Sequence, residues 1–321
     1  MRVAVLCGGR SSEHDVSLRS GASVVRGLEA AGHEAVAVAI GRDGRWLNDG
    51  ASPRLTPAAG LLDADAVFPA LHGAFGEDGS VQGLLEWLDV PYVGSDVLAS
   101  AICMDKLTLK RIFAARGIPQ VEFAAVGEEG WRERCESLGL PLWVKPSRMG
   151  SSVGISKVED LADLEVAVEL ALRHDPRVIV EASASGREVE CSVLGNEDPL
   201  TSLPGEIVAH AEWYDFEAKY EQGGMELRVP APIAEAEAGR VRELAAATFA
   251  LAGCSGLARC DFFVEPGGEI LVNEINTMPG FTETSVYAKL LEASGIAYPD
   301  LCDRLVELAV ERHQRARSYE F

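Results

Sequence analysis

Strand-like and helix-like segments alternate along the N-terminal part of this chain. Short apolar runs are typical of buried strands, and longer amphipathic segments are typical of helices. In chain order the expected elements are a strand at Val3–Leu6, a helix from about Ser17 to Ala31, strands at Glu34–Ile40 and Ala66–Leu71, and a helix at about Ser80–Leu88. The alternation predicts a sheet covered by helices, and therefore a small doubly wound α/β domain over roughly residues 1–97.

The rest of the chain predicts a further mixture of helices and strands. One long helix is expected at about Val97–Arg116, because Gly117 and Pro119 would end it. The later elements are strands near Gln120–Val126, Pro141–Pro146, Gly154–Lys157, Val178–Glu181 and Glu188–Leu194, helices near Leu161–Arg173 and Glu235–Ala252, a long loop at Tyr214–Gly224, a hairpin and two C-terminal helices. Pro53–Pro57 and Gly127–Trp131 are expected to be loops.

Composition limits the class of protein. With 321 residues, 47% hydrophobic and 25% charged, the chain fits a soluble globular protein of two or three domains. It contains no apolar run of membrane-spanning length and no signal-peptide pattern, and its seven cysteines are scattered without a CxxC pair, so we expect reduced thiols in a cytoplasmic protein. The net charge of −21 argues against nucleic acid or an anionic membrane as a partner, although local lysines could still bind a nucleotide.

A hairpin near the C-terminus is predicted to carry one charged face. Gly256–Asp261 and Val272–Asn276 have strand patterns, and Glu265–Glu269 between them has a turn pattern. A two-residue turn at Gly267-Gly268 would pair Asp261 with Glu274 and Arg259 with Asn276. These four side chains would then share one face, and the opposite face would carry the mostly apolar Cys260, Phe262, Val264, Leu271 and Ile275.

The charged face of this hairpin is a candidate metal site. Two carboxylates on directly opposed residues lie roughly 5 Å apart and repel unless a cation lies between them. Oxygen ligands of this kind suit Mg²⁺ that is held together with phosphate. A solvated acidic hairpin with a chance ion pair is the alternative.

A second candidate site is the Gly- and Ser-rich segment Val144–Ile155, which connects two expected strands. Such a loop exposes N–H and hydroxyl donors that can close over phosphate, and Lys145 adds a positive charge. The segment is not a Walker A loop, because the lysine precedes the glycines and Pro146 opposes a following helix. A hairpin with a flexible tip is the alternative.

Several motifs together resemble the D-alanine–D-alanine ligases, which belong to the ATP-grasp superfamily. The resemblance covers essentially the whole chain and lies in the order and spacing of Gly8–Ser17, Leu71–Gly79, Met104-Asp105-Lys106, the loop after Lys145, Arg259-Cys260-Asp261 and Asn273–Ser285. It implies an N-terminal substrate-binding domain over residues 1–97, a central ATP-grasp lobe over 98–180, and a C-terminal lobe over 181–321 with the metal hairpin and a lid loop. The expected fold is therefore a doubly wound α/β domain followed by a two-lobed α+β ATP-grasp fold.

The resemblance also implies roles for individual residues. For the nucleotide and two Mg²⁺ (or Mn²⁺) ions, Lys106, Lys145 and Ser152 belong to the phosphate site, Glu181 lies near the adenine, Glu188 contacts the ribose, and Asp261, Glu274 and Asn276 are the metal ligands. For the reaction, Arg259 stabilises the transferred phosphoryl group and Gly280 offers an N–H to the oxyanion. For the amino acids, Glu13 receives the first ammonium with Ser151 and Tyr220 as partners, His72 lies beside the first carboxylate, and Lys219 and Ser285 hold the second carboxylate.

Local sequence offers plainer roles for some of these positions. Ser285 could cap the following helix, His72 could be a loop histidine with satisfied nitrogens, and Glu13 could cap a helix start. Lys219 and Tyr220 could belong to a loop without a site role.

The resemblance implies an enzyme that joins two D-alanine molecules through a D-alanyl phosphate, with ATP, for peptidoglycan precursor synthesis. Related enzymes that make D-alanyl-D-lactate usually carry histidine at the position of Tyr220, so tyrosine favours an amine as second substrate. The small residues Ala182–Ser185 replace bulkier ones of many relatives, which leaves the shape of the adenine pocket open. The resemblance also implies a homodimer.

Three alternative functions follow from the same sequence. The first is a ligase on this scaffold with D-serine, D-lactate or another amino acid as second substrate. The second is a non-catalytic nucleotide-binding protein, which the intact set of acids and lysines disfavours. The third is a dinucleotide-binding oxidoreductase, which the absence of a GxGxxG run after the first strand disfavours.

Overall fold

The N-terminal unit is a four-stranded sheet in the order β3-β2-β1-β4. In this computed structural model, which describes residues 1–209 and 225–320, its elements are β1 (Arg2–Gly8), α1 (His14–Ala30), β2 (Glu34–Ile40), β3 (Trp46–Leu47), β4 (Ala66–Pro69) and α2 (Ser80–Leu88). Strands β2 and β4 both run parallel to β1, as the predicted alternation of strands and helices requires. The expected boundaries of β2 and α2 are confirmed, and β1 and α1 are longer than predicted. The carboxyl ends of the parallel strands therefore carry the Gly8–Ser17 and Leu71–Gly79 segments.

The prediction of a single helix at Val97–Arg116 is wrong, because the structure has two helices there. They are α3 (Val97–Met104) and α4 (Lys106–Ala115), separated at Asp105, whose backbone is extended. The Asp105 carboxylate accepts hydrogen bonds from the Thr108 N–H at 3.1 Å and the Ser147 hydroxyl at 2.8 Å, and lies 2.7 Å from Arg177. Short polar side chains at a helix start satisfy its free N–H groups, so this aspartate starts a new helix. The break directs Lys106 towards the loop that begins at Ser147.

We expect Asp105→Ala to lower the free energy of unfolding by about 2–4 kcal/mol, because it removes the cap and leaves Arg177 and the Ser147 hydroxyl without their partner. Asp96→Ala is the matched control, because Asp96 caps α3 through the Ala99 N–H, and its loss should cost about 1 kcal/mol. Urea unfolding of both variants measures the difference. Equal losses would show that Asp105 is only a cap.

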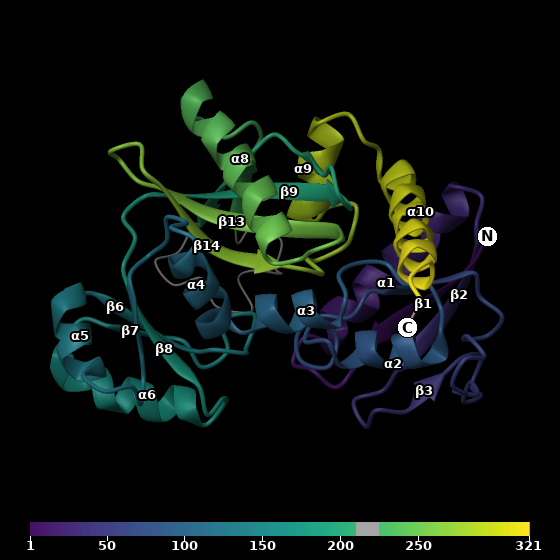
Figure 1. Ribbon diagram of the computed structural model, residues 1–321, viewed down its shortest axis with the longest axis horizontal. Helices are drawn as coiled ribbons and strands as arrows, with labels where there is room; N and C mark the ends of the chain where they lie inside the picture. The colour runs from purple at the N-terminus through teal and green to yellow at the C-terminus, as the bar shows by residue number, and fades with distance from the viewer. Residues whose placement is uncertain (210–224, 321) are drawn as a thin grey trace.

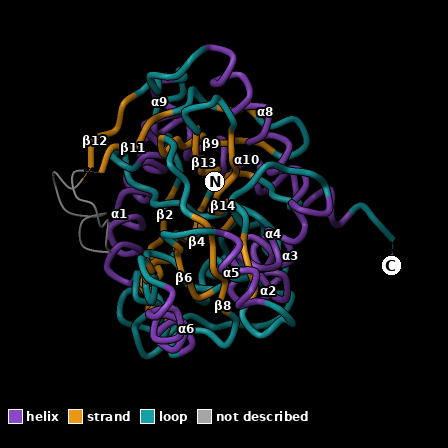
Figure 2. The backbone as a smooth tube through the Cα atoms, turned by 90° about the vertical axis from the view of Figure 1, so that its left-hand side faces the viewer, coloured by secondary structure: helices purple, strands orange, loops and turns teal. Residues whose placement is uncertain are grey.

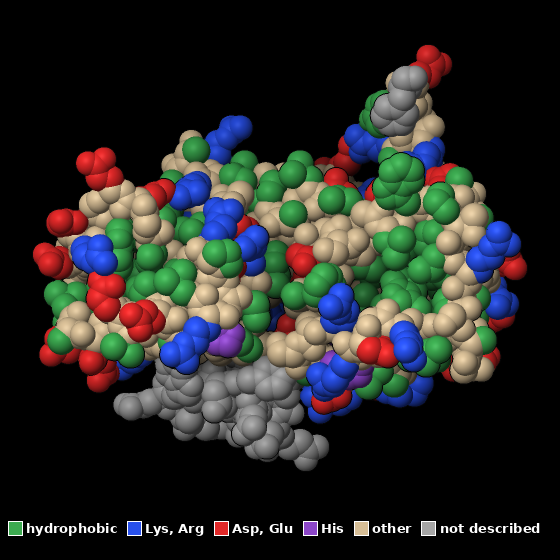
Figure 3. Space-filling view, turned by 90° about the horizontal axis from the view of Figure 1, so that it is seen from below, with side chains coloured by type: hydrophobic (Ala, Val, Ile, Leu, Met, Phe, Trp, Pro, Cys, Tyr) green, Lys and Arg blue, Asp and Glu red, His purple; other side chains and the backbone are tan. Residues whose placement is uncertain are grey.

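The central unit is a second four-stranded sheet, in the order β5-β8-β6-β7. Its elements are β5 (Phe123–Ala125), α5 (Trp131–Leu138), β6 (Leu142–Pro146), β7 (Ser156–Val158), a 3₁₀ turn (Leu161–Asp163), α6 (Leu164–Leu172) and β8 (Val178–Ala182). Helices α5 and α6 pack on this sheet and share one apolar core with it. Helix α5 was not predicted, and residues 127–130 alone form the expected loop there. Figure 3 shows that acidic side chains gather over this end of the molecule on the face viewed.

The C-terminal unit is a sheet in the order β12-β11-β9-β13-β14, with β10 paired to β9. Its elements are β9 (Arg187–Gly195), β10 (Leu200–Thr201), β11 (Gly205–Ala209), β12 (Met225–Arg228), α8 (Glu235–Leu251), β13 (Gly256–Val264), β14 (Ile270–Asn276), α9 (Val286–Ala293) and α10 (Tyr298–Arg317). Figure 1 shows the three sheets as separate groups of strands, and Figure 2 shows most strands in the interior, with β11 and β12 at one edge, and most helices outside. Helix α10 packs against α1 and β4 of the N-terminal unit, so the two ends of the chain share a core.

The β13–β14 hairpin has the predicted pairing at its far end but not at its turn. Asp261 pairs with Glu274 and Arg259 with Asn276, as expected. The turn is longer than the predicted two residues, because Glu265 closes it with the Glu269 carbonyl, and a bulge after Asp261 shifts the register back. The two deviations cancel, so the charged face keeps its composition.

The bulge changes the apolar face of the hairpin. Ile270 and Val272 are buried in its core together with Cys260, Phe262 and Val264, whereas Leu271 pairs with Phe263 on the other face. The placement of Leu271 in the core was therefore wrong. Helices α3, α4 and α8 cover the apolar face, which leaves the opposite face of the sheet for the charged side chains.

The predicted division of the chain at residues 97 and 180 stays a prediction. Strand β8 (Val178–Ala182) crosses the second boundary, and its pairing with β5 and β6 keeps it in the central sheet.

Candidate active site

The charged face of the hairpin is a compact network around Asp261. The Arg259 guanidinium donates two hydrogen bonds to the Asp261 carboxylate, both at 2.7 Å, and the Asn276 amide donates a third at 3.1 Å. Asp261 is 2% exposed, so the local dielectric is low and these charged hydrogen bonds are strong. Glu274, the predicted cross-strand partner of Asp261, lies 3.8 Å from the Lys106 ammonium.

Glu190 belongs to the same face and was missed in the sequence. Strand β9 places it directly opposite Asp261, and its carboxylate lies 2.9 Å from the Arg259 guanidinium. Burial alone would lower the pKa of Arg259, but the carboxylates of Asp261 and Glu190 outweigh it and raise the pKa well above the usual value. Arg259 is therefore a permanent cation held by two acids. Glu188 lies two residues before Glu190 on the same strand and thus on the same face.

The Gly- and Ser-rich loop is fixed at its base. Lys106 donates from its ammonium to the Met149 carbonyl at 2.8 Å, and the Lys106 N–H donates to the Ser147 carbonyl at 3.0 Å. At the tip, Ser151 and Ser152 have left-handed backbone angles, with φ of 51° and 60°, which non-glycine residues rarely adopt. A fixed base and a strained tip that carries two serines suit a loop that binds phosphate.

The partly exposed Lys145 and the buried Glu181 form an ion pair on neighbouring strands of the central sheet. The Lys145 ammonium lies 2.6 Å from one carboxylate oxygen of Glu181, and Lys110 lies 2.7 Å from the other. Burial opposes ionisation of Glu181, but the two lysines outweigh it and hold its pKa at about 2. Burial also opposes the charge on Lys145, yet Glu181, Glu274 and Glu188 together raise its pKa. Lys145 therefore lies in the field of acids from both the central and the C-terminal sheets.

The predicted ammonium acceptor Glu13 meets the phosphate loop. Glu13 is 7% exposed and accepts a short hydrogen bond from the Ser151 hydroxyl. A Cβ atom on Gly73 would lie 2.4 Å from a Glu13 carboxylate oxygen, and one on Gly150 would lie 3.4 Å from it. Glycine at position 73 is therefore needed for Glu13 to reach the loop. The side chain makes no capping hydrogen bond to α1, so the capping alternative is excluded.

His72 is a buried link between the N-terminal and C-terminal units. One ring nitrogen lies 3.0 Å from the Met278 carbonyl and must donate to it, and the other lies 2.8 Å from the Ser20 hydroxyl. The Ser20 oxygen in turn accepts the Phe281 N–H at 3.3 Å. Burial lowers the pKa of His72, and this effect outweighs the nearby Glu13 and the Met278 carbonyl. A neutral imidazole with both nitrogens bonded holds the Met278–Phe281 segment against the N-terminal unit, and this matches the satisfied-histidine alternative.

Glu77 lies in the Leu71–Gly79 segment and has no role implied by the resemblance. Its carboxylate accepts the Gly73 N–H at 2.7 Å, so it lies beside the glycine that Glu13 also touches. Burial first, and then the charge of Glu13, raise the pKa of Glu77 to about 8. Hydrogen bonds from the Gly73 and Met278 backbone lower it in part, and Glu274 raises it further.

The raised pKa of Glu77 predicts a pH-dependent stability. The folded protein binds the proton more tightly than the unfolded chain, so this group makes the free energy of unfolding fall as pH rises from about 4.5 to about 8. Glu77→Gln is neutral at every pH and removes this loss. We expect the variant to gain stability relative to the parent between pH 5 and pH 8 in urea unfolding. Glu269→Gln at the exposed hairpin turn is the control, and a difference that does not change with pH would contradict the assignment.

The remaining predicted residues lie at the C-terminal end of the site or outside the described residues. Ser285 stands at the N-cap position of α9, but its hydroxyl donates to the Thr282 carbonyl at 2.7 Å and makes no capping bond. A Cβ on Gly280 would come within 4.0 Å of Ser285, so the two residues are close. Lys219 and Tyr220, and the predicted lid loop, lie in residues 210–224, outside the described part of the chain.

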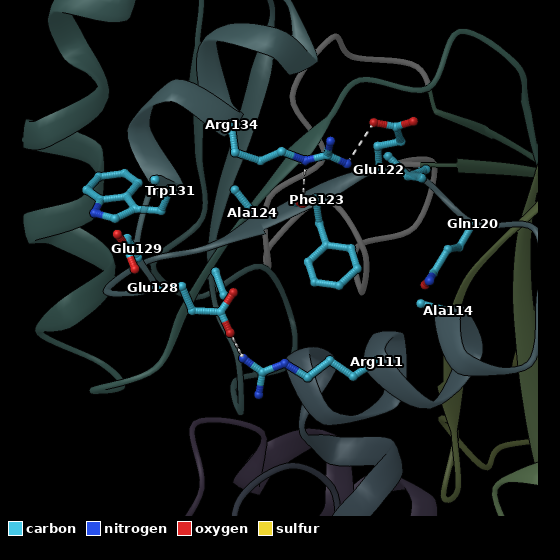
Figure 4. A pocket seen from close by; sticks show the side chains of 13 residues that line it. Arg111, Ala114, Gln120, Glu122, Phe123, Ala124, Glu128, Glu129, Trp131 and Arg134 are labelled. Carbon is cyan, nitrogen blue, oxygen red and sulfur yellow. Dashed lines mark hydrogen bonds and ion pairs between the residues drawn. The ribbon is translucent and has the colours of Figure 1, made fainter.

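A cavity of about 600 Å³ lies elsewhere, among α4, β5 and α5 (Figure 4). Both arginines that line it pair with acids of the same wall, Arg111 with Glu128 and Arg134 with Glu122. Of the described residues predicted for the site, none lines this cavity. Its location therefore does not define the active site.

The chemistry of the donor set decides which metal would fit. Asp261, Glu274 and Asn276 offer oxygen atoms at the end of the hairpin, where Arg259 and Lys106 now contact the carboxylates. No group of three His, Cys, Asp or Glu side chains in the described residues is arranged to hold a metal alone. Mg²⁺ typically takes one or two carboxylates and completes its shell with substrate phosphates and water. The residues fit a metal that arrives with a nucleotide.

Comparisons with known proteins agree with this geometry. The sequence model described as D-ala D-ala ligase C-terminus matches residues 112–307, and the one described as D-ala D-ala ligase N-terminus matches residues 2–60 and 53–95. The chain is 44% identical over 324 residues to a D-alanine–D-alanine ligase of Solibacter usitatus, covering 100% of this chain and 99% of the relative. It is 45% identical to one of Deinococcus radiodurans over 97% of this chain and 98% of that relative.

Solved structures share the fold. The D-alanine–D-alanine ligase of Coxiella burnetii superimposes with a TM-score of 0.90 at 37% identity and covers 99% of this chain and 96% of that one. The VanG D-Ala:D-Ser ligase of Enterococcus faecalis gives 0.88 at 34% identity, covering 96% and 99%.

The fold and its site thus define an ATP-grasp protein, as predicted. The chain belongs to the D-alanine–D-alanine ligase family, which is ATP-dependent, and the resemblance inferred from its motifs is confirmed. It is an enzyme that acts on small molecules. In the part of the chain that the structure describes, no helix combines the length and the apolar character needed to cross a membrane.

Proposed function

We propose that the protein joins two D-alanine molecules to D-alanyl-D-alanine at the expense of ATP, through a D-alanyl phosphate, and so supplies peptidoglycan precursors. One observation carries this proposal. Ser151 at the tip of the phosphate loop donates a hydrogen bond to Glu13, which comes from the first motif of the N-terminal unit. A carboxylate suited to an amino acid's ammonium therefore lies beside a loop suited to a nucleotide's phosphates.

The nucleotide side of the site is assigned to residues of two sheets. Lys106 and Lys145 provide ammonium groups for phosphate oxygens, with Ser152 from the loop tip, and Glu181 and Glu188 face the base and the ribose. Asp261, Glu274 and Asn276 would hold two Mg²⁺ or Mn²⁺ ions together with the phosphates. Such ions would neutralise phosphate charge and orient the terminal phosphoryl group for transfer.

The chain's own residues then account for the amino-acid chemistry. A free carboxylate is a poor electrophile, and phosphorylation gives it a leaving group. Glu13 and Ser151 fix the first D-alanine by its ammonium, and Arg259 faces the charge that develops as the phosphoryl group moves. The Gly280 N–H, positioned by the segment that His72 holds, would stabilise the oxyanion when the second amine attacks. Ser285 lies close enough to Gly280 to bind the second carboxylate, with Lys219 and Tyr220 as further partners.

We also propose a cytoplasmic homodimer. The seven cysteines of the chain are all free and buried, which suits a reducing compartment. Light scattering coupled to gel filtration would test the dimer, and a monomer at micromolar concentration would contradict it.

The experiment that tests the function is phosphate release from ATP across a panel of D- and L-amino acids and D-hydroxy acids, with the product identified by mass spectrometry. We expect release with D-alanine alone and D-alanyl-D-alanine as the product. Release that requires D-serine or D-lactate as well would assign the alternative ligase activities. ATP binding without D-alanine-dependent release would exclude a ligase.

A further inference from the structure

We propose that Lys110 is a positioning residue of the ATP site, which neutralises Glu181 so that Lys145 keeps a positive charge for a phosphate. The inference rests on the proposed function, because it takes Lys145 as a phosphate ligand. Lys110 was not singled out in the sequence, where it is one of several lysines and arginines of a helix.

Lys110 is buried, and its ammonium group has partners on several sides. The residue lies on α4, is 2% exposed, and its ammonium lies 2.7 Å from Glu181 and 3.2 Å from the Val121 carbonyl. The ring of Phe123 lies below the ammonium, with 5.7 Å between the nitrogen and the ring centre. The carbonyl of Lys110 accepts a hydrogen bond from the Gln120 side chain at 2.9 Å. A lysine is rarely buried to this degree unless its charge is paired.

Lys110, Glu181 and Lys145 form a row of three charges, and their net charge sets how strongly they attract a phosphate. One carboxylate lies between two ammonium groups, Lys110 at 2.7 Å and Lys145 at 2.6 Å, so the group of three carries a net charge of about +1. Without Lys110, Glu181 and Lys145 would form a closed neutral pair. That pair would attract a phosphate much less, since a bound anion would have to compete with Glu181 for the same ammonium.

The exposure of the two lysines decides which one faces the ligand. The Lys145 side chain is 17% exposed, whereas that of Lys110 is 2% exposed. Acids of the C-terminal sheet, Glu274 and Glu188, also act on Lys145, which places it on the side where the nucleotide would bind. Lys110 thus acts through Glu181 and does not touch the nucleotide itself.

Variants of Lys110 separate this role from a merely structural one. Lys110→Met removes the charge and keeps most of the volume, and Lys110→Arg keeps the charge. The double variant Lys110→Met with Glu181→Gln restores the net charge of the group. Lys289→Met is the control, because Lys289 is an exposed lysine of α9 that pairs with Glu292 within its own helix.

The primary readout is the Kd of magnesium-bound ADP, measured by calorimetry at several salt concentrations, with the melting temperature of each variant. We expect Lys110→Met to raise the Kd at least about tenfold and to make it less dependent on salt, and Lys110→Arg to stay within about threefold of the parent. Because Lys110 acts through Glu181, the double variant should bind within about threefold of Glu181→Gln alone. In steady state, the KM for ATP should rise in Lys110→Met more than the KM for D-alanine.

Two results would overturn the proposal. One is a folded Lys110→Met protein whose Kd lies within twofold of the parent. The other is a double variant that binds more than about threefold more weakly than Glu181→Gln alone, because a lysine that acts through Glu181 has no effect once that side chain is neutral. If Lys110→Met does not fold, the double variant, which has no unpaired buried carboxylate, carries the same test against Glu181→Gln alone. Failure of the parent to release phosphate with D-alanine would refute the proposed function and leave the ADP titration interpretable.

Discussion

Replacing Asp261 by asparagine is expected to lower turnover by about 10²–10³-fold at saturating ATP and Mg²⁺, as for other residues that stabilise developing charge. Asp261 is buried, faces Glu274 across the hairpin, and binds Arg259 by two hydrogen bonds. Asparagine keeps the shape but removes the negative charge that would bind a divalent ion. Phosphate release in the presence of D-alanine measures the effect.

The control for Asp261 is Glu269→Gln, which removes an acid at the exposed turn of the same hairpin. It should leave turnover unchanged. Near-parent turnover of Asp261→Asn at saturating Mg²⁺ would refute the assignment of this residue as a metal ligand. A loss that persists at saturating Mg²⁺, with unchanged turnover in Glu269→Gln, would support it.

Replacing Arg259 by methionine is expected to lower turnover by about 10²–10³-fold and to lower the free energy of unfolding by about 3–5 kcal/mol. The second effect follows because Asp261 and Glu190, both less than one tenth exposed, would lose the cation between them. Turnover and urea unfolding are measured on the same protein. An active variant with unchanged stability would contradict both roles.

Arg259→Lys separates charge from geometry. Lysine restores a cation between the two acids and should recover part of the lost stability. It cannot form the planar two-point contact with Asp261, so turnover should stay low. Full recovery of turnover in the lysine variant would show that a positive charge alone is sufficient.

The charged face of the hairpin was predicted correctly from the sequence, although the predicted turn was too short and the bulge after Asp261 was not predicted. The alternation of side chains and the pairing of Asp261 with Glu274 depend on local strand geometry, which the sequence encodes. The turn length and the bulge after Asp261 depend on how the chain closes at Glu265 and Glu269, and a Gly-Gly pair fits more than one turn. Leu271 was misplaced for this reason.

The break between α3 and α4 shows what local pattern misses. Residues 97–116 have a continuous helical pattern, and Asp105 looks like an ordinary helix residue. Its partners Ser147 and Arg177 are far along the chain, and their contacts decide that the helix restarts there. An aspartate three residues before a threonine N–H was the available signal for a cap.

Glu190 and Lys110 could not be found from local sequence for a related reason. Glu190 joins the site because β9 pairs with β13, and a register between distant strands is not readable from either strand alone. Lys110 meets Glu181 only after α4 packs beside β8. The other site residues were assigned from the motif spacing that identified the family. Their individual roles stay predictions.

The central claim is that the carboxylate of the first D-alanine is phosphorylated before the amine attacks. D-Alanine labelled with ¹⁸O in both carboxylate oxygens tests it directly, because the oxygen that bridges to phosphorus leaves with the phosphate. The account predicts inorganic phosphate that carries one ¹⁸O atom per dipeptide formed. Unlabelled phosphate alongside labelled dipeptide would show that no acyl phosphate forms and would contradict the account.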